Sequence, residues 1–359
     1  MNRVPIYPII QALLAAALFG ASTPVAKWLL DRVEPIPLAA FLYLGSGTGL
    51  LLFRVLQRMG NRSIRVEAPV RKTDLAWLTA AVLAGGVAAP ILLMFSLRTA
   101  PAATASLLLN FEGTATALIA ALVFKEAIAG RVWGAIGCIT AGSVMLSVDL
   151  RAEWGFSFGA AGVLGACAFW GLDNNLTRGV SARDPFSIVM IKGLGAGSFS
   201  LLLSLLQGVP FPEPWVVFGA MLLGSFGYGF SIVMFVLAMR GLGTARASAF
   251  FGTAPFIGAF VSFLFLGETP DLFTVISIPI MIVGAILLLS EKHAHRHIHA
   301  AIEHDHRHRH DNGHHVHEHE EDETLADLHA HPHTHDEIEH LHPHAPEIHH
   351  RHDHQKKGD

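Results

Sequence analysis

The chain carries the same apolar pattern twice, at a fixed spacing. Residues 97–147, shifted by 142 positions, align with residues 239–289. The matching pairs include Arg98 and Arg240, Ala103 and Ala245, Ala105 and Ala247, Ser106 and Ser248, Glu126 and Glu268, and Gly142 and Gly284. The starts of the two halves also match at an offset of 150 to 151, where Lys27 corresponds to Arg178 and Pro35 to Pro185. A repeat in which both copies are apolar is typical of a duplicated membrane unit.

Composition divides the chain into two parts. Of its 359 residues, 52% are hydrophobic and 15% are charged, which is more apolar than a soluble domain. All 23 histidines lie after Ser290, where the charge balance is −9, whereas the body up to Ser290 has a balance of +5. Cys138 and Cys167 lie within apolar runs, which favours a packing role over a metal motif or a disulfide.

The apolar body is long enough for ten membrane spans, because one span needs about 20 apolar residues. The runs cover residues 9–30, 36–53, 75–96, 101–124, 132–148, 156–176, 186–206, 215–237, 244–266 and 272–290. We read the first run as a retained span, since it is longer than the apolar core of a signal peptide. The sequence therefore predicts an all-α membrane protein, with five spans in residues 1–149 and five in residues 150–290.

The loop charges predict the orientation of these spans. With the N-terminus in the cytoplasm, thirteen loop Lys and Arg residues lie on the inner side and four on the outer side. We therefore expect an integral protein of a bacterial inner (plasma) membrane with both termini in the cytoplasm. Five spans per half also make the second repeat inverted relative to the first. Glu126 and Glu268 then lie at opposite surfaces, where we expect each to bond backbone groups at the start of the next helix.

Both halves contain a span that ends in an apolar-to-Glu step, LVFKE at 122–126 and LFLGE at 264–268, followed by a glycine-bearing span. With two five-span halves, residues 9–290 resemble the EamA domain family of the drug/metabolite transporter superfamily. The resemblance implies a carrier that moves small metabolites, often outward, by alternating access. Such domains usually have a proline in the middle of spans four and nine. The second half has Pro255, whereas the first half reads Glu112-Gly113.

A carrier needs polar groups near the middle of the membrane. The candidates for substrate binding or proton coupling are Glu112, Asn110 and Thr116 in span four, Trp170, Asp173 and Asn174 in span six, and Lys192 in span seven. We expect Glu112 to exchange a proton for a cationic substrate; the alternative is a neutral carboxyl that is hydrogen-bonded inside the bundle. Lys192 could pair with Glu112 or Asp173 or snorkel to the surface, and Asp173 could instead pair with Arg178.

Residues 291–359 are predicted to be a disordered tail, because they have no apolar period on which to fold. Imidazole suits Zn²⁺, Ni²⁺, Co²⁺ and Cu²⁺, and its titration near pH 6.5 would make the tail more basic as the pH falls. The candidate metal ligands are His293, His295, His297, His299, His304, His306, His308, His310, His314, His315, His317, His319, His329, His331, His333 and His335. The alternative is a solvated tether with incidental metal affinity.

The sequence favours transport over catalysis. A body without histidine cannot form a Ser-His-Asp triad, and the glycines at 45, 47 and 49 lie inside a span rather than in a dinucleotide fold. We expect a proton-coupled exporter of small metabolites that requires no cofactor. Its expected partners are the lipid bilayer, a small-molecule substrate and divalent ions at the tail, with no nucleic acid; an oligomer is left open. Two alternatives are an exporter of Ni²⁺, Co²⁺ or Zn²⁺ using Glu112, Asn110 and Asp173, and a membrane sensor or scaffold.

Overall fold

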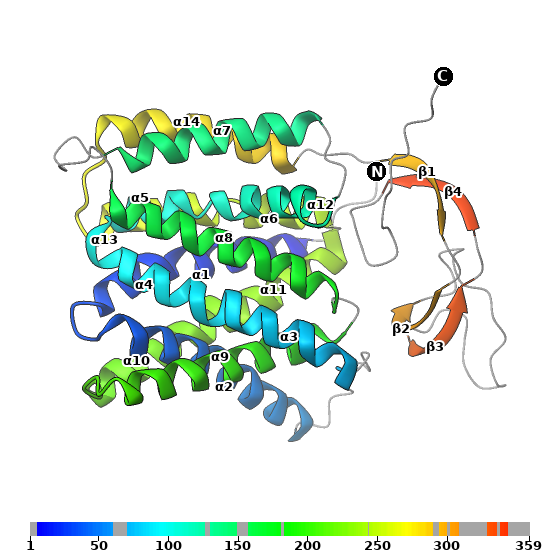
Figure 1. The fold of residues 1–359 in the computed structure, drawn as a ribbon, viewed down its shortest axis with the longest axis horizontal. Coiled ribbons are helices and arrows are strands. Elements are labelled where there is room, and N and C mark those ends of the chain that lie inside the picture. Colours follow the sequence, from blue (N-terminus) through cyan, green and yellow to red (C-terminus); the bar gives the residue numbers. More distant parts are fainter. Residues whose placement is uncertain are drawn as a thin grey trace.

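Apolar helices run side by side through the body of the protein (Figure 1). The computed structural model describes residues 6–59, 70–125, 130–148, 157–180, 183–242 and 244–289, and four short segments of the tail. The helices are α1 (Ile6–Leu29), α2 (Pro35–Met59), η1 (Lys72–Asp74), α3 (Leu75–Ala81), η2 (Val82–Ala88), α4 (Ala89–Thr99), α5 (Ala102–Leu108), α6 (Phe111–Leu122), α7 (Gly130–Ser147), α8 (Phe158–Arg178), α9 (Pro185–Leu206), α10 (Pro214–Leu223), η3 (Gly224–Phe230), α11 (Ser231–Leu242), α12 (Thr244–Phe251), α13 (Ala254–Phe265) and α14 (Leu272–Leu289).

Seven helical stretches within the described residues are long and apolar enough to cross a membrane. They are Ile6–Leu29, Pro35–Gln57, Lys72–Thr99, Ala102–Leu122, Pro185–Leu206, Pro214–Met239 and Ala247–Phe265. Helix α14 is apolar but shorter, and α7 and α8 occupy the positions of predicted spans five and six. The prediction of an apolar helical membrane protein is thus confirmed, while ten crossings remain a prediction.

The irregular backbone segments lie at equivalent positions in the two halves of the sequence repeat. The π-helical segment η2 lies between α3 and α4, and η3 lies between α10 and α11, 142 residues further on. A second pair of interruptions separates α5 from α6 and α12 from α13. π-Helical turns and helix breaks release backbone groups from the regular ladder and often mark functional sites. Both halves therefore have the same two irregular places in corresponding spans.

The two halves pack against each other through equivalent helices. Helix α2 packs along α9, and α7 packs along α14; these two pairs lie at the bottom and top of Figure 1. Helix α1 packs against α13 and α11, as α8 packs against α6 and α4. The main buried cluster draws on both halves, with Leu42 and Leu93 from the first and Met281 from the second. The core is therefore shared between the repeats.

The tail contains strands in the segments that the structure describes, which differs from the predicted disorder. Strand β1 (Ala294–His299) pairs antiparallel with β4 (Ile338–Pro343), and β2 (Ile302–His308) pairs with β3 (His329–His335). The His-x-His pattern has a period of two, which is also the side-chain period of a strand. Backbone pairing can therefore order such a segment without an apolar period. The candidate ligands His293, His310, His314, His315, His317 and His319 lie outside the described residues.

Candidate functional site

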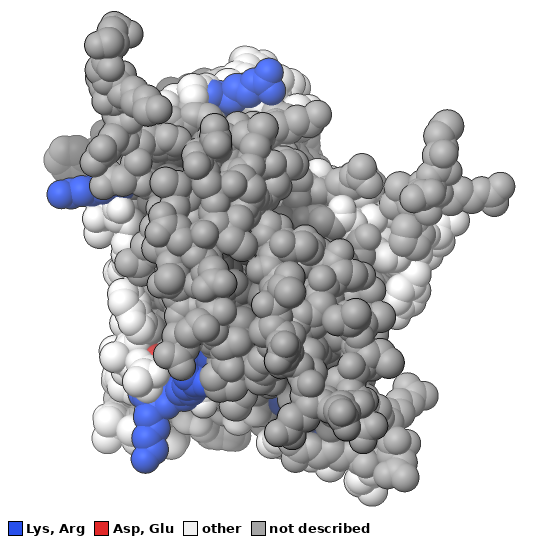
Figure 2. Space-filling view, turned by 90° about the vertical axis from the view of Figure 1, so that its right-hand side faces the viewer, with Lys and Arg blue, Asp and Glu red and all other residues white. Residues whose placement is uncertain are grey.

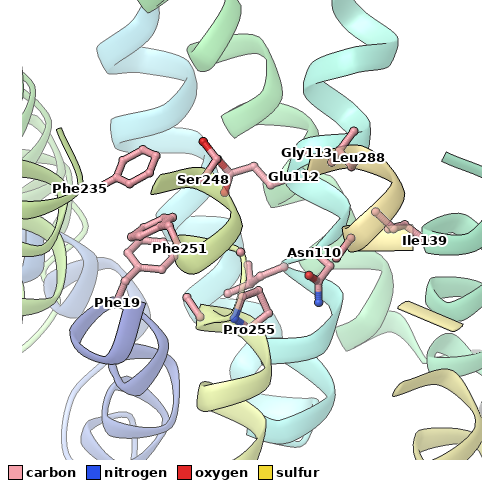
Figure 3. Close-up of a pocket in the computed structure, with 14 residues that line it drawn as sticks. Phe19, Asn110, Glu112, Gly113, Ile139, Phe235, Ser248, Phe251, Pro255 and Leu288 are labelled. Atoms are coloured by element: carbon pink, nitrogen blue, oxygen red, sulfur yellow. The ribbon is translucent and has the colours of Figure 1, made fainter. Parts of the chain in front are cut away.

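A cavity of about 210 Å³ lies beside the interruptions in both broken spans. Its polar lining residues are Asn110, Glu112 and Ser248. The remaining lining residues are apolar or glycine: Phe19, Leu109, Gly113, Ile139, Phe235, Phe251, Gly252, Ala254, Pro255, Ala285 and Leu288. Three aromatic rings gather on one side of the cavity, and Asn110, Ile139 and Leu288 lie on the other (Figure 3). Among the described lining residues, the cavity is therefore mainly apolar and Glu112 is its one carboxylate.

The sequence repeat brings unequal residues to this cavity. Glu112 corresponds to Ala254 at the offset of 142, and both line it. The two helix breaks have a similar local design: the Asn110 side chain donates to Leu107 O at 2.9 Å, and the Thr253 hydroxyl donates to Phe250 O at 2.6 Å. Each carbonyl also accepts the backbone N–H of the same residue at 3.1 Å, so the side chain adds a second hydrogen bond at the break. The first break thus forms without the proline that the second break contains.

Glu112 lies in the first turn of α6, where the helix dipole favours negative charge. Its Oε1 accepts a hydrogen bond of 2.9 Å from the Asn174 side chain, which also donates to Thr116 Oγ1 at 3.1 Å. The Thr116 hydroxyl donates to the backbone carbonyl of Glu112 at 2.8 Å. Because a carboxylate has about four acceptor positions, Glu112 keeps acceptor capacity for a proton or a cation.

Asp173 and Lys192 form an ion pair between α8 and α9. Lys192 Nζ lies 2.6 Å from both carboxylate oxygens of Asp173 and 3.2 Å from Thr177 Oγ1, and the Thr177 hydroxyl donates to Asp173 at 2.9 Å. The side chains of Asp173 and Lys192 are 7% and 17% exposed, so the lysine does not reach the surface. Of the partners that the sequence left open for Lys192, the structure selects Asp173. The pair neutralises itself beside the cavity rather than within its lining.

The carbonyl oxygen of Gly85, in η2, binds side chains from two other helices, a contact that the sequence did not predict. It accepts hydrogen bonds from Trp170 Nε1 at 2.9 Å and from the Tyr43 hydroxyl at 2.7 Å. A Cβ atom on Gly85 would lie 2.0 Å from Asp173 Oδ2. The Asp173 carboxylate therefore packs directly on the π-helical backbone. The available sequence signal was the match of Gly85 with Gly227 at the repeat offset.

The aromatic wall was also missed. The rings of Phe19 and Phe251 have centroids 5.3 Å apart, and those of Phe235 and Phe251 are 4.4 Å apart. Within an apolar run, the sequence alone does not distinguish a phenylalanine that faces a cavity from one that faces lipid or packs in the core. The neighbourhood of Phe251 and Pro255 at one helix break was the signal that could have pointed to this wall.

Glu268 bonds a helix start, as expected, but in the other repeat. Its two carboxylate oxygens accept hydrogen bonds of 2.7 Å from the backbone N–H groups of Ala102 and Ala103, at the start of α5. The sequence predicts a bond to the start of the next helix, which is α14, so this detail of the prediction is wrong. Glu126, the equivalent residue in the first repeat, lies outside the described residues.

The two ends of the bundle differ in charge. The end where α2, α6 and α8 finish has the exposed residues Arg71, Lys72, Lys125 and Arg131. Figure 2 looks toward this side of the molecule, where basic side chains are visible at several points among the described residues. The opposite end has Lys27, Arg32 and Arg98, of which Arg98 pairs with Glu34 at 2.7 Å.

These features define a class of protein: a membrane helix bundle built from two equivalent halves, with a cavity at two discontinuous spans. The EamA-like transporter family matches residues 6–148 and 157–290, and the chain belongs to this family. The resemblance seen in the sequence is thus confirmed, and the family's members are transporters.

Similarity to individual proteins agrees with this assignment. The chain is 28% identical over 296 residues to an "Uncharacterized transporter" of Methanothermobacter thermautotrophicus, covering 78% of this chain and 85% of the relative. A solved structure titled "Crystal structure of protein" superposes with a TM-score of 0.55 at 18% identity, over 77% of this chain and 95% of that one. At this identity the second match shows a shared fold.

Proposed function

We propose that the protein is a secondary transporter that exports small cationic metabolites by alternating access, with Glu112 taking a proton in exchange for the substrate. The observation that carries this proposal is the Glu112 carboxylate, the one carboxylate among the described residues that line an apolar cavity at both broken spans. Discontinuous membrane helices commonly form the substrate sites of such carriers. Burying an ionisable side chain within a membrane span costs free energy, and such residues commonly mark functional sites.

The chemistry of the cavity favours an amine with an apolar body. Glu112 supplies a counter-charge, and the rings of Phe19, Phe235 and Phe251 supply apolar contact and faces that attract cations. The volume of about 210 Å³ is of the size that suits a small metabolite. Ser248 and Asn110 add polar contacts that can orient the substrate.

Because the proton and the cationic substrate compete for the same Glu112 carboxylate, binding of one displaces the other. A proton on Glu112 removes the charge that attracts an ammonium group, and a bound ammonium group disfavours protonation. The ion pair between Asp173 and Lys192 keeps both of its charges occupied, so it does not compete for the substrate. Loading on one side of the membrane would therefore release a proton, and unloading on the other side would take one up.

The tail is proposed to bind divalent ions on the cytoplasmic side. The register of the paired strands supports this, because His297 is opposite His340 and His306 is opposite His331. Export of the ions themselves is less well supported, because that path needs Asp173 as an oxygen ligand and Lys192 occupies both of its oxygens. The excess of basic residues at the end where α2 and α6 finish supports a cytoplasmic location for that end.

Efflux measurements test the proposal. Cells that express the full chain, Glu112→Gln, Glu34→Gln or the chain cut after Lys292 are loaded with small amines or with Ni²⁺, Co²⁺ and Zn²⁺. We expect the full chain and Glu34→Gln to export an amine against its gradient, and Glu112→Gln to lose this activity. Glu34 is an exposed acid at the surface and serves as the control. Unchanged amine export by Glu112→Gln would refute the role of this carboxylate.

A further inference from the structure

Tight packing of three helices lies between the cavity and the end that carries Glu268, and we call this contact the closure. Helices α1, α5 and α13 pack against one another there. A Cβ atom on Gly258 would lie 2.7 Å from both Gly20 O and Ser106 Oγ, so the three helices are in direct contact. Ser106 is 1% exposed, and its neighbours Ala105 and Leu107 are fully buried. The described side chains at this contact leave no opening for a metabolite between the three helices.

The cavity lies on the other side of that closure. Its lining residues on span nine run from Ser248 to Pro255, toward the start of the span. On α14 they include Leu288, next to the last residue of the helix. Among the described residues, the closure therefore lies on the Glu268 side of the cavity, and the cavity reaches into the opposite half of the bundle.

Two side chains hold the segment that joins α4 to α5 at the closed end. The Lys27 ammonium donates hydrogen bonds to the carbonyls of Leu97 and Ala100, the latter at 2.9 Å. From the other repeat, Glu268 accepts from the N–H groups of Ala102 and Ala103. A cation thus meets the carbonyl end of one helix and an anion meets the amide end of the next, which is the favourable arrangement for both helix dipoles.

We propose that Lys27 and Glu268 form a gate, and that releasing their bonds is the step that opens the cavity toward the Glu268 side. The proposal rests on the transport function above. The gate connects α1, the α4–α5 junction and the segment after α13, which are the parts that the closure holds together. Because all four partners are backbone groups, the strength of the gate depends on these two side chains.

Cysteine accessibility tests the gate without any substrate. In a parent with Cys138→Ala and Cys167→Ala, Ser106→Cys reports on the closure and is treated with a membrane-impermeant maleimide in sealed vesicles of both orientations. We expect slow labelling in the parent. Glu268→Gln and Lys27→Met should label from the Glu268 side at least about tenfold faster, the smallest factor expected when one hydrogen bond to a charged group is lost. Lys27→Arg should stay close to the parent.

Two controls separate gating from unfolding. Glu34→Gln removes an exposed acid at the same end and should leave the labelling rate unchanged. Ser143→Cys, 1% exposed on α7, should remain unlabelled in the gate variants. Equal rates in the parent, Glu268→Gln and Lys27→Met would overturn the proposal, as would rapid labelling of the parent or an equal rise at Ser143→Cys. Transport is not measured, so an absence of amine export would leave this result intact.

Discussion

Neighbouring polar residues on α8 have separate roles. Asp173 is bound by Lys192, whereas Asn174 donates to Glu112. Successive residues of a helix point about 100° apart, so adjacent side chains face different neighbours. The sequence could predict that residues 173–175 form a polar cluster within a span. It could not predict which residue meets which partner, because that depends on the rotation of α8 against α6 and α9.

Removing only one partner of the ion pair between Asp173 and Lys192 should destabilise the folded protein. Lys192→Met leaves a buried carboxylate without its partner, and we expect it to lower the free energy of unfolding by about 3–5 kcal/mol. Combining it with Asp173→Asn removes both charges and should restore most of the loss. Denaturant unfolding in detergent micelles measures both. Equal losses in the single and double variants would mean that the pair does not act as a unit.

The broken and π-helical spans were only partly foreseeable. A proline within a span, such as Pro255, can interrupt a helix, but no break is predicted there from the sequence. The first break lacks a proline, and the Asn110 side chain adds a hydrogen bond to Leu107 O at that place. The π-helical segments had no sequence signal that separates them from other glycine-bearing spans. Their backbone is held by remote partners, such as the Tyr43 and Trp170 side chains on Gly85 O.

Gly85 should tolerate no side chain. A methyl group there would overlap the Asp173 carboxylate, and we expect Gly85→Ala to lower the free energy of unfolding by about 1–3 kcal/mol. The matched control is Gly137→Ala on α7, where a Cβ atom meets nothing within 4 Å. That change should be neutral or stabilise the protein by about 0.5–1 kcal/mol, because alanine favours a helix over glycine. Equal effects at both sites would contradict the packing of Asp173 on η2.

At the level of the whole molecule, two equivalent halves enclose one unequal site. The duplication, the apolar spans and the family could be predicted from the sequence, because all three depend on its repeat pattern and its composition. The cavity did not follow, because its aromatic wall is formed by residues from α1, α11 and α12 that look like ordinary packing residues. Glu112 could be identified early because a carboxylate within an apolar run is conspicuous.

The tail should be separable from the body. Cutting the chain after Lys292 removes every histidine, and we expect it to abolish tight Zn²⁺ and Ni²⁺ binding while leaving the thermal unfolding midpoint unchanged. Binding by the full chain should weaken as the pH falls from 7.5 to 5.5, because imidazole must be neutral to ligate a metal. Isothermal titration of both forms checks this. Equal metal binding by the cut chain would place the site in the body.

The central claim is that Glu112 exchanges a proton for a cation. The most direct measurement follows proton release from purified protein in weakly buffered detergent as benzyltrimethylammonium is added, a permanent cation that carries no titratable proton. We expect proton release that saturates together with binding in the full chain and in Glu34→Gln, and no proton release in Glu112→Gln. Proton release of the same size from Glu112→Gln would contradict it.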